Sequence, residues 1–309
     1  MKILIFGIGT LYGVAKQANL FEKDEILAFV DNDESKQSTL FENKPVISPQ
    51  SISEYSFEKI IITILDYDKV YFQLISLGID AEKIFCYAKG NIISVQEQYQ
   101  KFQSLKYNII SIGTYCLPRF ITTLAEIKPK KCFGELTLPF DLVIHYNIRE
   151  IIKLLETDFR DYFNDLEWDE KRINWTNNSV QVYYIHDRKL KKEEFIKTYQ
   201  QRIENFRTYC KSDKHAFFIL STFYNGMQIT ENEIKDLYNA LLKTRGERAF
   251  SLIIINHAAP ISNPHDNICI INQPFTLTSK WHDELSTEEG KLFYNNIVKR
   301  INNFIREKI

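Results

Sequence analysis

The sequence predicts an α/β protein with two domains, a small Rossmann-like parallel-sheet domain followed by a larger α/β domain. Three observations support this fold class. Short apolar runs alternate with helical patterns, a polar, Gln-rich stretch interrupts the alternation at residues 89–106, and 309 residues exceed what one core usually holds. We therefore expect a nucleotide- or nucleotide-sugar-binding domain at 1–88, a connecting helix at 89–106 and a second domain at 107–309.

In the first domain, near-continuous apolar runs predict the strands of a parallel sheet covered on both faces. The strands are expected at residues 2–6, 26–30, 59–64 and 83–87, with one helix ending near residue 20 and another around 69–77.

A glycine pattern follows the first strand of this domain. Gly7, Gly9 and Gly13 form G-x-G-x-x-x-G, one residue longer than the dinucleotide-binding fingerprint. The early glycines would let backbone N–H groups approach a phosphate at the helix N-terminus. Asp31 ends the second strand, where a ribose-binding acid lies in such folds. A tight strand-to-helix turn and a helix-capping Asp explain the same residues without a ligand.

Three short segments carry a family resemblance: Ile3–Gly13, Phe29–Asp33 and Lys44–Ile47. Through them the first domain resembles the small Rossmann-like domain attached to sugar O- and N-acyltransferases and to some sugar-modifying methyltransferases. The resemblance implies a nucleotide-linked sugar as ligand. A complete dehydrogenase is not indicated, because the second mononucleotide half is absent.

The second domain shows the same alternation of strands and helices. Its strands are expected at residues 107–112, 180–185, 215–220, 250–255 and 268–271, and its helices at 117–127, 148–155, 192–209, 231–243 and 287–307. In the longest of the central helices, Phe195, Tyr199 and Phe206 recur at helical spacing, which is typical of core packing.

Cys116 is the most informative residue of this domain. It follows an apolar strand and a Gly turn, and it precedes a predicted helix with Pro118 in its first turn. A thiol at a helix N-terminus lies in the positive end of the helix dipole, which favours the nucleophilic thiolate. The alternative is a buried structural cysteine.

Two histidines are expected beside this thiol, because open α/β sheets present ligands at the carboxyl ends of their strands. His186 follows the run at 180–185, and His257 follows the run at 250–255. A thiol within hydrogen-bond reach of an imidazole is the minimum for a sulfur nucleophile.

The imidazole needs an orienting group, and the substrate needs polar contacts. Asp141, in a turn-prone segment, is the first candidate for orienting the ring, with Asn256 and Asp187 as alternatives. Four side chains are candidates for substrate binding: Arg119 and Arg202 as bidentate ligands of a carboxylate or phosphate, and Trp281 and His282 as lid contacts from a polar loop. Surface charges and an exposed loop are the alternatives for these four.

A metal site is not expected. The five cysteines are scattered without C-x-x-C pairs, and no H-x-x-x-H or mixed Cys/His spacing is present. His145 is expected in a loop and His215 at a strand start, and neither is assigned a role.

The segments around these residues carry a second resemblance: Ser111–Pro118, Pro139–Leu142, Ile185–Asp187, Tyr199–Phe206 and Ile254–His257. Together they resemble a bacterial family of unknown function described as papain-like cysteine peptidases. The likeness covers most of residues 107–300 and implies a Cys/His site more directly than peptide cleavage. The family usually has Asp-Trp where this chain has Asp141-Leu142, which implies that an aromatic wall is missing. The Gly-x-x-Cys opening is also similar to thiol-containing polysaccharide-modification proteins of capsule gene clusters.

These features predict a thiol-dependent acyl transferase or hydrolase acting on a bacterial surface-polysaccharide precursor of capsule or lipopolysaccharide. No cofactor is required for that chemistry, and a nucleotide-sugar or coenzyme A is a candidate ligand. One alternative is a papain-like peptidase, although the Gly-Ser-Cys-Trp sequence typical of papain is absent. The other is a non-catalytic nucleotide-sugar-binding protein, in which Cys116 is inert.

Composition limits the partners. With a formal net charge of −1, nothing attracts the chain globally to nucleic acid, and its basic runs are offset by nearby acids. No apolar run approaches the roughly 20 residues that span a bilayer, and no signal peptide is recognised. We expect a cytoplasmic protein that binds a small molecule or glycan, and the sequence predicts no particular oligomeric state.

Overall fold

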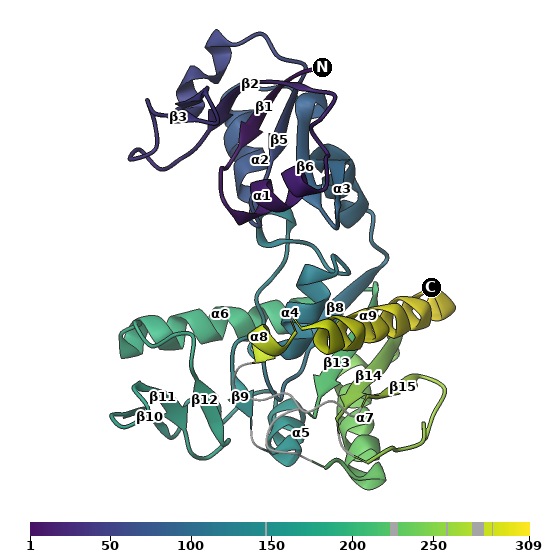
Figure 1. Cartoon of the computed structure of the whole chain (residues 1–309). Coiled ribbons are helices and arrows are strands. Elements are labelled where there is room, and N and C mark those ends of the chain that lie inside the picture. The colour runs from purple at the N-terminus through teal and green to yellow at the C-terminus, as the bar shows by residue number, and fades with distance from the viewer. Residues whose placement is uncertain (146, 223–227, 258, 274–280, 286) are drawn as a thin grey trace. The chain divides into compact units, whose positions relative to one another are not determined.

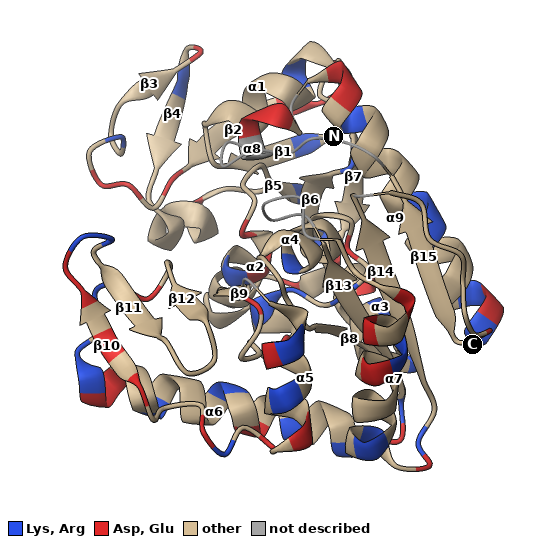
Figure 2. Ribbon diagram, turned by 90° about the horizontal axis from the view of Figure 1, so that it is seen from below, with Lys and Arg blue, Asp and Glu red and all other residues tan. Residues whose placement is uncertain are grey.

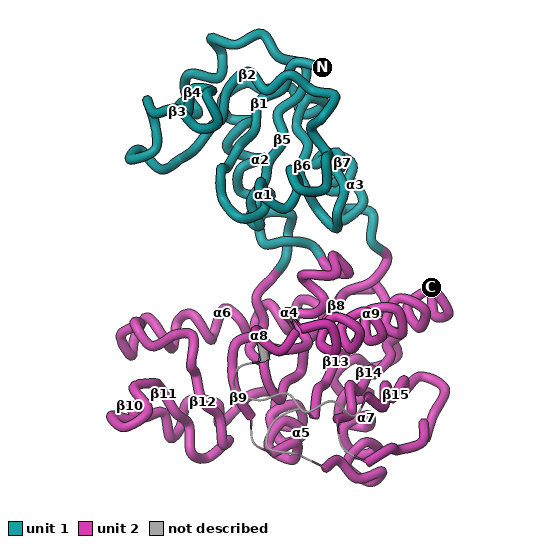
Figure 3. Tube along the Cα trace, in the orientation of Figure 1, with its two compact units in different colours: residues 1–105, 129–135 teal, residues 106–128, 136–309 magenta. Residues whose placement is uncertain are grey.

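The computed structural model describes residues 1–145, 147–222, 228–257, 259–273, 281–285 and 287–309 (Figure 1). The chain forms two compact units (Figure 3). Unit 1 comprises residues 1–105 and 129–135, and unit 2 comprises residues 106–128 and 136–309. The predicted α/β class is confirmed: one mostly parallel sheet lies in unit 1, and a parallel and an antiparallel sheet lie in unit 2.

Unit 1 is built on a seven-stranded sheet of order β3-β4-β2-β1-β5-β6-β7, whose central strands are parallel and whose edge strands β3 and β7 are antiparallel. Its elements, with η for 3₁₀ helices, are β1 (Lys2–Phe6), α1 (Thr10–Gln17), β2 (Glu25–Val30), β3 (Leu40–Phe41), β4 (Lys44–Ile47), η1 (Pro49–Glu54), β5 (Lys59–Ile62), α2 (Tyr67–Ser76), η2 (Ala81–Lys83), β6 (Ile84–Ala88), β7 (Asn91–Ser94), α3 (Val95–Gln103) and η3 (Lys131–Phe133).

The strand order of unit 1 contains a topological switch point. From β1 the chain moves to β2 and β4 on one side, and then crosses to β5 and β6 on the other side. The connections that leave the carboxyl ends of β1 and β5 therefore run to opposite sides, and open α/β sheets bind ligands at such a point.

Unit 1 extends beyond the segment that the sequence suggests. The predicted connecting helix is α3, which packs on this unit through the buried Val95 and Phe102. Residues 129–135, which the sequence assigns to the second domain, also belong here. Phe133 is buried among the aromatic rings of unit 1, and the Cys132 N–H donates to Asp68 Oδ2 (2.9 Å). The run Lys-Pro-Lys-Lys before Phe133 resembles a solvated loop, so its anchoring role is invisible in the local pattern.

Unit 2 contains a parallel sheet of order β15-β14-β13-β8 and an antiparallel sheet of order β10-β11-β12-β9. Its elements are β8 (Tyr107–Ser111), α4 (Leu117–Leu124), β9 (Ile144–His145), α5 (Ile148–Glu156), β10 (Leu166–Asp169), β11 (Asn174–Asn177), β12 (Val182–Tyr184), α6 (Lys192–Lys211), β13 (His215–Ser221), α7 (Glu231–Arg245), β14 (Phe250–Asn256), β15 (Ile268–Asn272), α8 (Trp281–Glu284) and α9 (Glu288–Lys308).

Both faces of the parallel sheet are covered by apolar side chains. Along β13, Phe218 and Leu220 enter the cluster that contains residues of α5, α6 and α7, whereas Phe217 and Ile219 enter the cluster that contains residues of α4 and α9. This follows from the period of two residues in a strand. Phe195, Tyr199 and Phe206 of α6 are buried in the first cluster, as predicted.

The segment at 180–185 differs from the expectation. It forms β12, which pairs with β9 and β11 in the antiparallel sheet and does not join β8, β13 and β14. A short apolar run does not reveal its partners, because pairing depends on residues far away in sequence.

The surface charges are mixed. Figure 2 shows Lys and Arg interspersed with Asp and Glu along helices such as α6 and α9. In the part of the chain that the structure describes, no helix combines the length and apolar character needed to cross a bilayer.

Candidate functional site

The turn before Cys116 is clamped between two strands. Gly113 follows β8 with φ +96°, and a Cβ there would lie 3.0 Å from the Ile151 side chain. The next residue, Thr114, donates from its N–H (3.3 Å) and its hydroxyl (2.7 Å) to the carbonyl oxygen of Ser221 at the end of β13. On the other side, the carbonyl oxygen of Thr114 accepts from the His145 N–H (2.8 Å). The position of Cys116 is thus fixed by long-range hydrogen bonds.

Cys116 occupies the N-cap of α4, as predicted, and Pro118 lies in the first turn. The thiol is half-buried against the apolar cluster of α4 and α9. This burial raises the pKa of Cys116 to about 11, while a hydrogen bond to its own backbone and the charge of Arg119 act to lower it. Burial therefore outweighs the groups that favour the thiolate, and the resting thiol is protonated at neutral pH. Chemistry at this sulfur requires a base.

Arg119 and Asp141 form the buried charged part of the site. Arg119 lies one turn into α4, and its Nε is 3.6 Å from Asp141 Oδ2. Asp141 is fully buried, and the same oxygen accepts from the Leu138 N–H (2.8 Å). Its second oxygen, Oδ1, has no hydrogen-bond partner among the described residues. Asp141 thus faces the arginine beside the thiol, and among the described residues no hydrogen bond joins it to a histidine ring.

His186 lies on the exposed turn that follows β12. Partial loss of water around the ring lowers its pKa, and Arg119, Arg188 and Arg202 act in the same direction, while Asp187 opposes them. The imidazole is therefore neutral at pH 7, the form that accepts a proton.

Asp187, next to His186, is held by a polar network from α6. Arg202 donates to both of its oxygens (2.8 and 3.1 Å), and the Tyr199 hydroxyl donates to Oδ2 (2.8 Å). Arg202 is mostly buried and lies over the Tyr199 ring. We expected the Arg202 guanidinium to bind substrate, but it is hydrogen-bonded to Asp187. Arg202 therefore supports the turn that carries His186.

His257 follows β14, as predicted, but its ring has another neighbour. The ring Nε2 lies 3.1 Å from the hydroxyl of the fully buried Ser221, and the backbone N–H of His257 donates to Thr222 Oγ1 (3.1 Å). The ring also packs near Phe293 of α9. Asn256, an alternative orienting group, is buried and donates to the Ala259 carbonyl and to Asn272 Oδ1 (both 2.8 Å).

The structure thus gathers the predicted residues into two groups. In the first, the charge of Arg119 acts on the pKa of both Cys116 and His186, and the same arginine faces Asp141. Tyr183 and Ile185, which lead into His186, pack on the same apolar cluster as Cys116. The second group is His257 with Ser221. Strand β13 lies between β8 and β14, so the strands that precede Cys116 and His257 are about 10 Å apart.

Two residues near Cys116 were not identified from the sequence. His145 is not in a loop but in β9, and it is fully buried beside the Gly113 turn. Neither ring nitrogen has a hydrogen-bond partner among the described residues, and burial lowers the pKa of His145 to about 3. The apolar run at residues 142–144 is the sequence feature that could have indicated a buried strand at this position. Ser221 is the other, and the end of the apolar run at 216–220 marks its position.

In unit 1, the glycine pattern serves the turn at the switch point. Gly7 has φ +97°, and a Cβ there would lie 2.5 Å from Ile64 Cγ2. Its N–H donates to the Val30 carbonyl (2.8 Å) and so is not directed at a ligand. Gly9 is the N-cap of α1, and Gly13 lies inside that helix with open space at its Cβ position. A glycine is therefore required by geometry at Gly7 and not at the other two positions.

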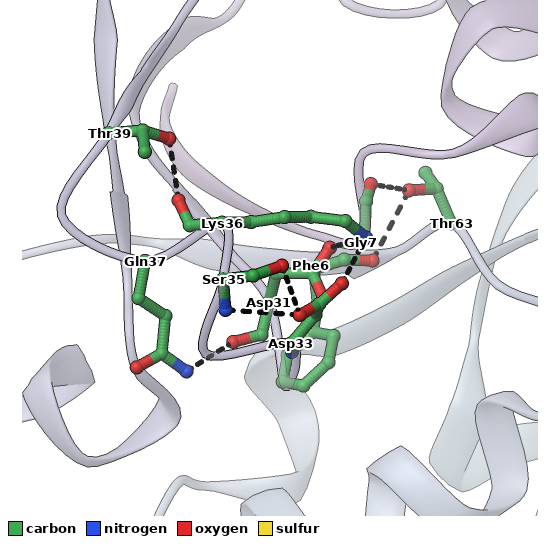
Figure 4. A network of polar contacts seen from close by, with 9 residues as sticks. All are labelled: Phe6, Gly7, Asp31, Asp33, Ser35, Lys36, Gln37, Thr39 and Thr63. Atoms are coloured by element: carbon green, nitrogen blue, oxygen red, sulfur yellow. Dashed lines mark hydrogen bonds and ion pairs between the residues drawn. The ribbon is translucent and has the colours of Figure 1, made fainter.

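Asp31 organises the loop after β2 (Figure 4). Its Oδ1 accepts from the Asp33 N–H (2.9 Å), its Oδ2 pairs with Lys36 Nζ (3.2 Å), and its carbonyl accepts from Gln37 Nε2 (2.9 Å). The carboxylate is largely buried in these contacts. Asp31 thus stabilises this loop through its own hydrogen bonds. That it also binds a ribose stays a prediction.

The remaining predictions concern residues whose surroundings are not described. Trp281 and His282 belong to the short helix α8, but their side chains lie outside the described part of the chain. In the described residues, no group of three His, Cys, Asp or Glu side chains is arranged to hold a metal ion.

Among known families, the match that is found lies within unit 1. Residues 1–85 match the family described as C2185-like, N-terminal. No papain-like family model matches the C-terminal residues, so that resemblance stays a prediction. No curated protein matches the chain.

Proposed function

We propose that this protein is a thiol-dependent acyl transferase or hydrolase acting on a surface-polysaccharide precursor, with Cys116 as its nucleophile. The observation that carries the proposal is the arrangement around Arg119. This cation lies one helical turn from Cys116, faces the buried Asp141, and acts on the pKa of both the thiol and His186. A nucleophile, a cation and a neutral imidazole are the groups that thiol acylation requires.

In the proposed mechanism, His186 accepts the thiol proton as Cys116 Sγ attacks the acyl carbonyl. The base is essential because the resting thiol has a pKa of about 11. His186 is suited to the role because its lowered pKa keeps it neutral. Arg119 stabilises the developing thiolate, and Asp141 holds the guanidinium in place. The tetrahedral intermediate expels its leaving group, which takes the proton from His186. A sugar hydroxyl or water then attacks the thioester carbonyl and gives its proton to His186. The C–S bond breaks, the acyl group passes to the acceptor, and His186 returns the proton to the Cys116 thiolate.

The glycan substrate is inferred from unit 1. Its strand order supports a ligand-binding role at the carboxyl ends of β1 and β5, where nucleotides bind in open α/β sheets. A nucleotide-sugar could be both the ligand of unit 1 and the acyl acceptor, because sugar hydroxyls and amines are common acyl acceptors.

The test is Cys116-dependent release of coenzyme A from acetyl-coenzyme A, followed by mass spectrometry with a panel of nucleotide-sugars. The proposal predicts free coenzyme A and a singly acetylated sugar with the native chain, and neither with Cys116→Ala. Cys132→Ser is the matched control, because Cys132 is an exposed thiol in unit 1. Equal release of coenzyme A by the native chain and by Cys116→Ala would show that Cys116 is not the nucleophile.

A second candidate, a non-catalytic nucleotide-sugar-binding protein, is favoured by one observation: the raised pKa of Cys116 is also that of an inert buried thiol. Thermal-shift measurements with nucleotide-sugars address it, since a ligand at 100 times its Kd adds about 2.7 kcal/mol of stability. Stabilisation by a nucleotide-sugar without any acylation of Cys116 would select this function.

A further inference from the structure

A polar hollow in unit 2 takes no part in the chemistry described above. It is lined by residues of α9 and of β15, the edge strand of the parallel sheet, and has a volume of about 510 Å³. Figure 1 shows the positions of these two elements. The apolar residues that line the hollow are Ile270 and Ile271 of β15. The polar residues that line it are Asn272, Gln273, Asn296, Lys299, Arg300 and Asn303.

The charge of the hollow has one sign. Lys299 and Arg300 are its only ionised side chains among the residues that the structure describes, and neither forms an ion pair with a described carboxylate. The side chains of Asn296 and Asn303 likewise have no hydrogen-bond partner within the described chain. On α9, residues 296, 299, 300 and 303 recur at spacings of three, four and seven, so they form one stripe that faces the end of β15.

The neighbouring hollow has a different character. It shares Arg300 and Asn303, also measures about 510 Å³, and continues along α9 toward Cys269. Its lining includes the carboxylates of Asp266 and Glu307. An anionic group is therefore favoured in the hollow at the carboxyl end of β15 and disfavoured in the neighbouring one.

The hollow with Lys299 and Arg300 also lies at the carboxyl edge of the sheet. Asn256 of β14 pairs with Asn272 of β15, and the Gln273 N–H donates to the Asn256 carbonyl (3.0 Å). Gln273 thus follows β15 as His257 follows β14. The hollow therefore lies at the same edge of the sheet as the Cys116 turn, which follows β8, two strands away from β14.

We infer that this hollow binds an anionic sugar, a uronate or a sugar phosphate, within an elongated glycan. A guanidinium binds carboxylate or phosphate in bidentate fashion, and side-chain amides donate to and accept from hydroxyl groups. A purely anionic ligand would not need the amides, and a neutral sugar would not need two unpaired cations. This inference rests on the proposed function and specifies that its glycan substrate is negatively charged.

The experiment is calorimetric titration of the full chain carrying Cys116→Ala, so that no turnover occurs. The probes are tri-galacturonate, glucose 1-phosphate and neutral maltotriose, at physiological salt. At least one anionic probe is expected to bind at least tenfold more tightly than maltotriose. Tri-galacturonate binding alone identifies a uronate, and glucose 1-phosphate binding alone identifies a sugar phosphate.

Arg300→Ala and Asn303→Ala are the test variants, and Arg306→Ala is the matched control, an exposed arginine of α9 outside the hollow. Arg300→Ala should weaken binding at least tenfold and Asn303→Ala severalfold, whereas Arg306→Ala should leave it within twofold. Equal losses for the two arginines, equal affinity for maltotriose, or no binding of any probe would overturn the inference. Because Cys116-dependent acylation is measured separately, either claim can fail alone.

Discussion

Arg119 Nε lies 3.6 Å from Oδ2 of Asp141, a carboxylate with no exposed surface. The arginine is one turn from Cys116 along α4, so the pair joins the thiol's helix to the buried turn at residues 138–141. This relationship has consequences for stability and for reactivity that can be separated.

Removing the arginine should destabilise unit 2. Arg119→Ala leaves Asp141 as an uncompensated buried charge, and we expect a loss of about 3 kcal/mol in unfolding free energy. In an Asp141→Asn background the same substitution should cost less than 1 kcal/mol, because no charge is then left unpaired. Urea unfolding of the four proteins checks the cycle. Equal costs in both backgrounds would show that the pair is not coupled.

The support beneath His186 gives a second prediction. Arg202→Ala removes both hydrogen bonds to the oxygens of Asp187, and we expect a loss of about 3–5 kcal/mol. Arg207→Ala, on the same helix, breaks more exposed ion pairs with Asp158 and Glu204 and should cost about 0.2–1 kcal/mol. Denaturant midpoints compare the two. Similar losses would contradict the assignment of Arg202 as the main support of this turn.

The buried His145 should make stability depend on pH. Its folded pKa of about 3 lies below the ordinary value of 6.5, so the unfolded chain binds the proton first as the pH falls. Stability should therefore be flat with respect to this group above pH 6.5 and decrease below it, by about 2 kcal/mol between pH 6.5 and pH 5.

His145→Phe should remove that decrease, because phenylalanine keeps the ring and does not titrate. The exposed His265→Gln is the control and should keep the pH dependence of the native chain. Unfolding at pH 7 and pH 5 measures the difference. An unchanged slope in His145→Phe would mean that this ring is hydrated or partnered in the folded state.

The glycine pattern of unit 1 predicts opposite effects at two positions. Gly7→Ala meets a left-handed backbone and a contact of 2.5 Å with Ile64, and should cost about 1–3 kcal/mol. Gly13→Ala meets open space inside a helix and should stabilise by about 0.5–1 kcal/mol. Thermal unfolding distinguishes them. If Gly13→Ala destabilises as much as Gly7→Ala, the pattern has a further role that the turn does not explain.

Much of the fold follows from local sequence patterns. The apolar runs before Gly7 and Gly113 predict β1 and β8, because strands covered on both faces form near-continuous apolar runs. Helix α6 follows from the spacing of Phe195, Tyr199 and Phe206. Cys116 was placed correctly at a helix N-cap, because a strand, a Gly turn and a Pro mark that position.

The remaining features depend on contacts that are distant in sequence. The partners of β12 are β9 and β11, which are short and partly polar, so neither shows a strand period. Phe133 anchors its segment in unit 1 although it follows the start of unit 2. His145 is buried because β9 lies against the Thr114 turn, and the pKa of Cys116 depends on which apolar groups surround it.

The most direct test of the account is the burst of p-nitrophenolate released from p-nitrophenyl acetate by the Cys132→Ser chain. We predict one equivalent per chain, with the acetyl group on Cys116 by intact and peptide mass. In this background His186→Ala should slow the burst by about 10²–10⁴, whereas His257→Ala should change it little because that ring is held by Ser221. A burst that persists in Cys116→Ala, or that has the same rate with and without His186, would contradict the account.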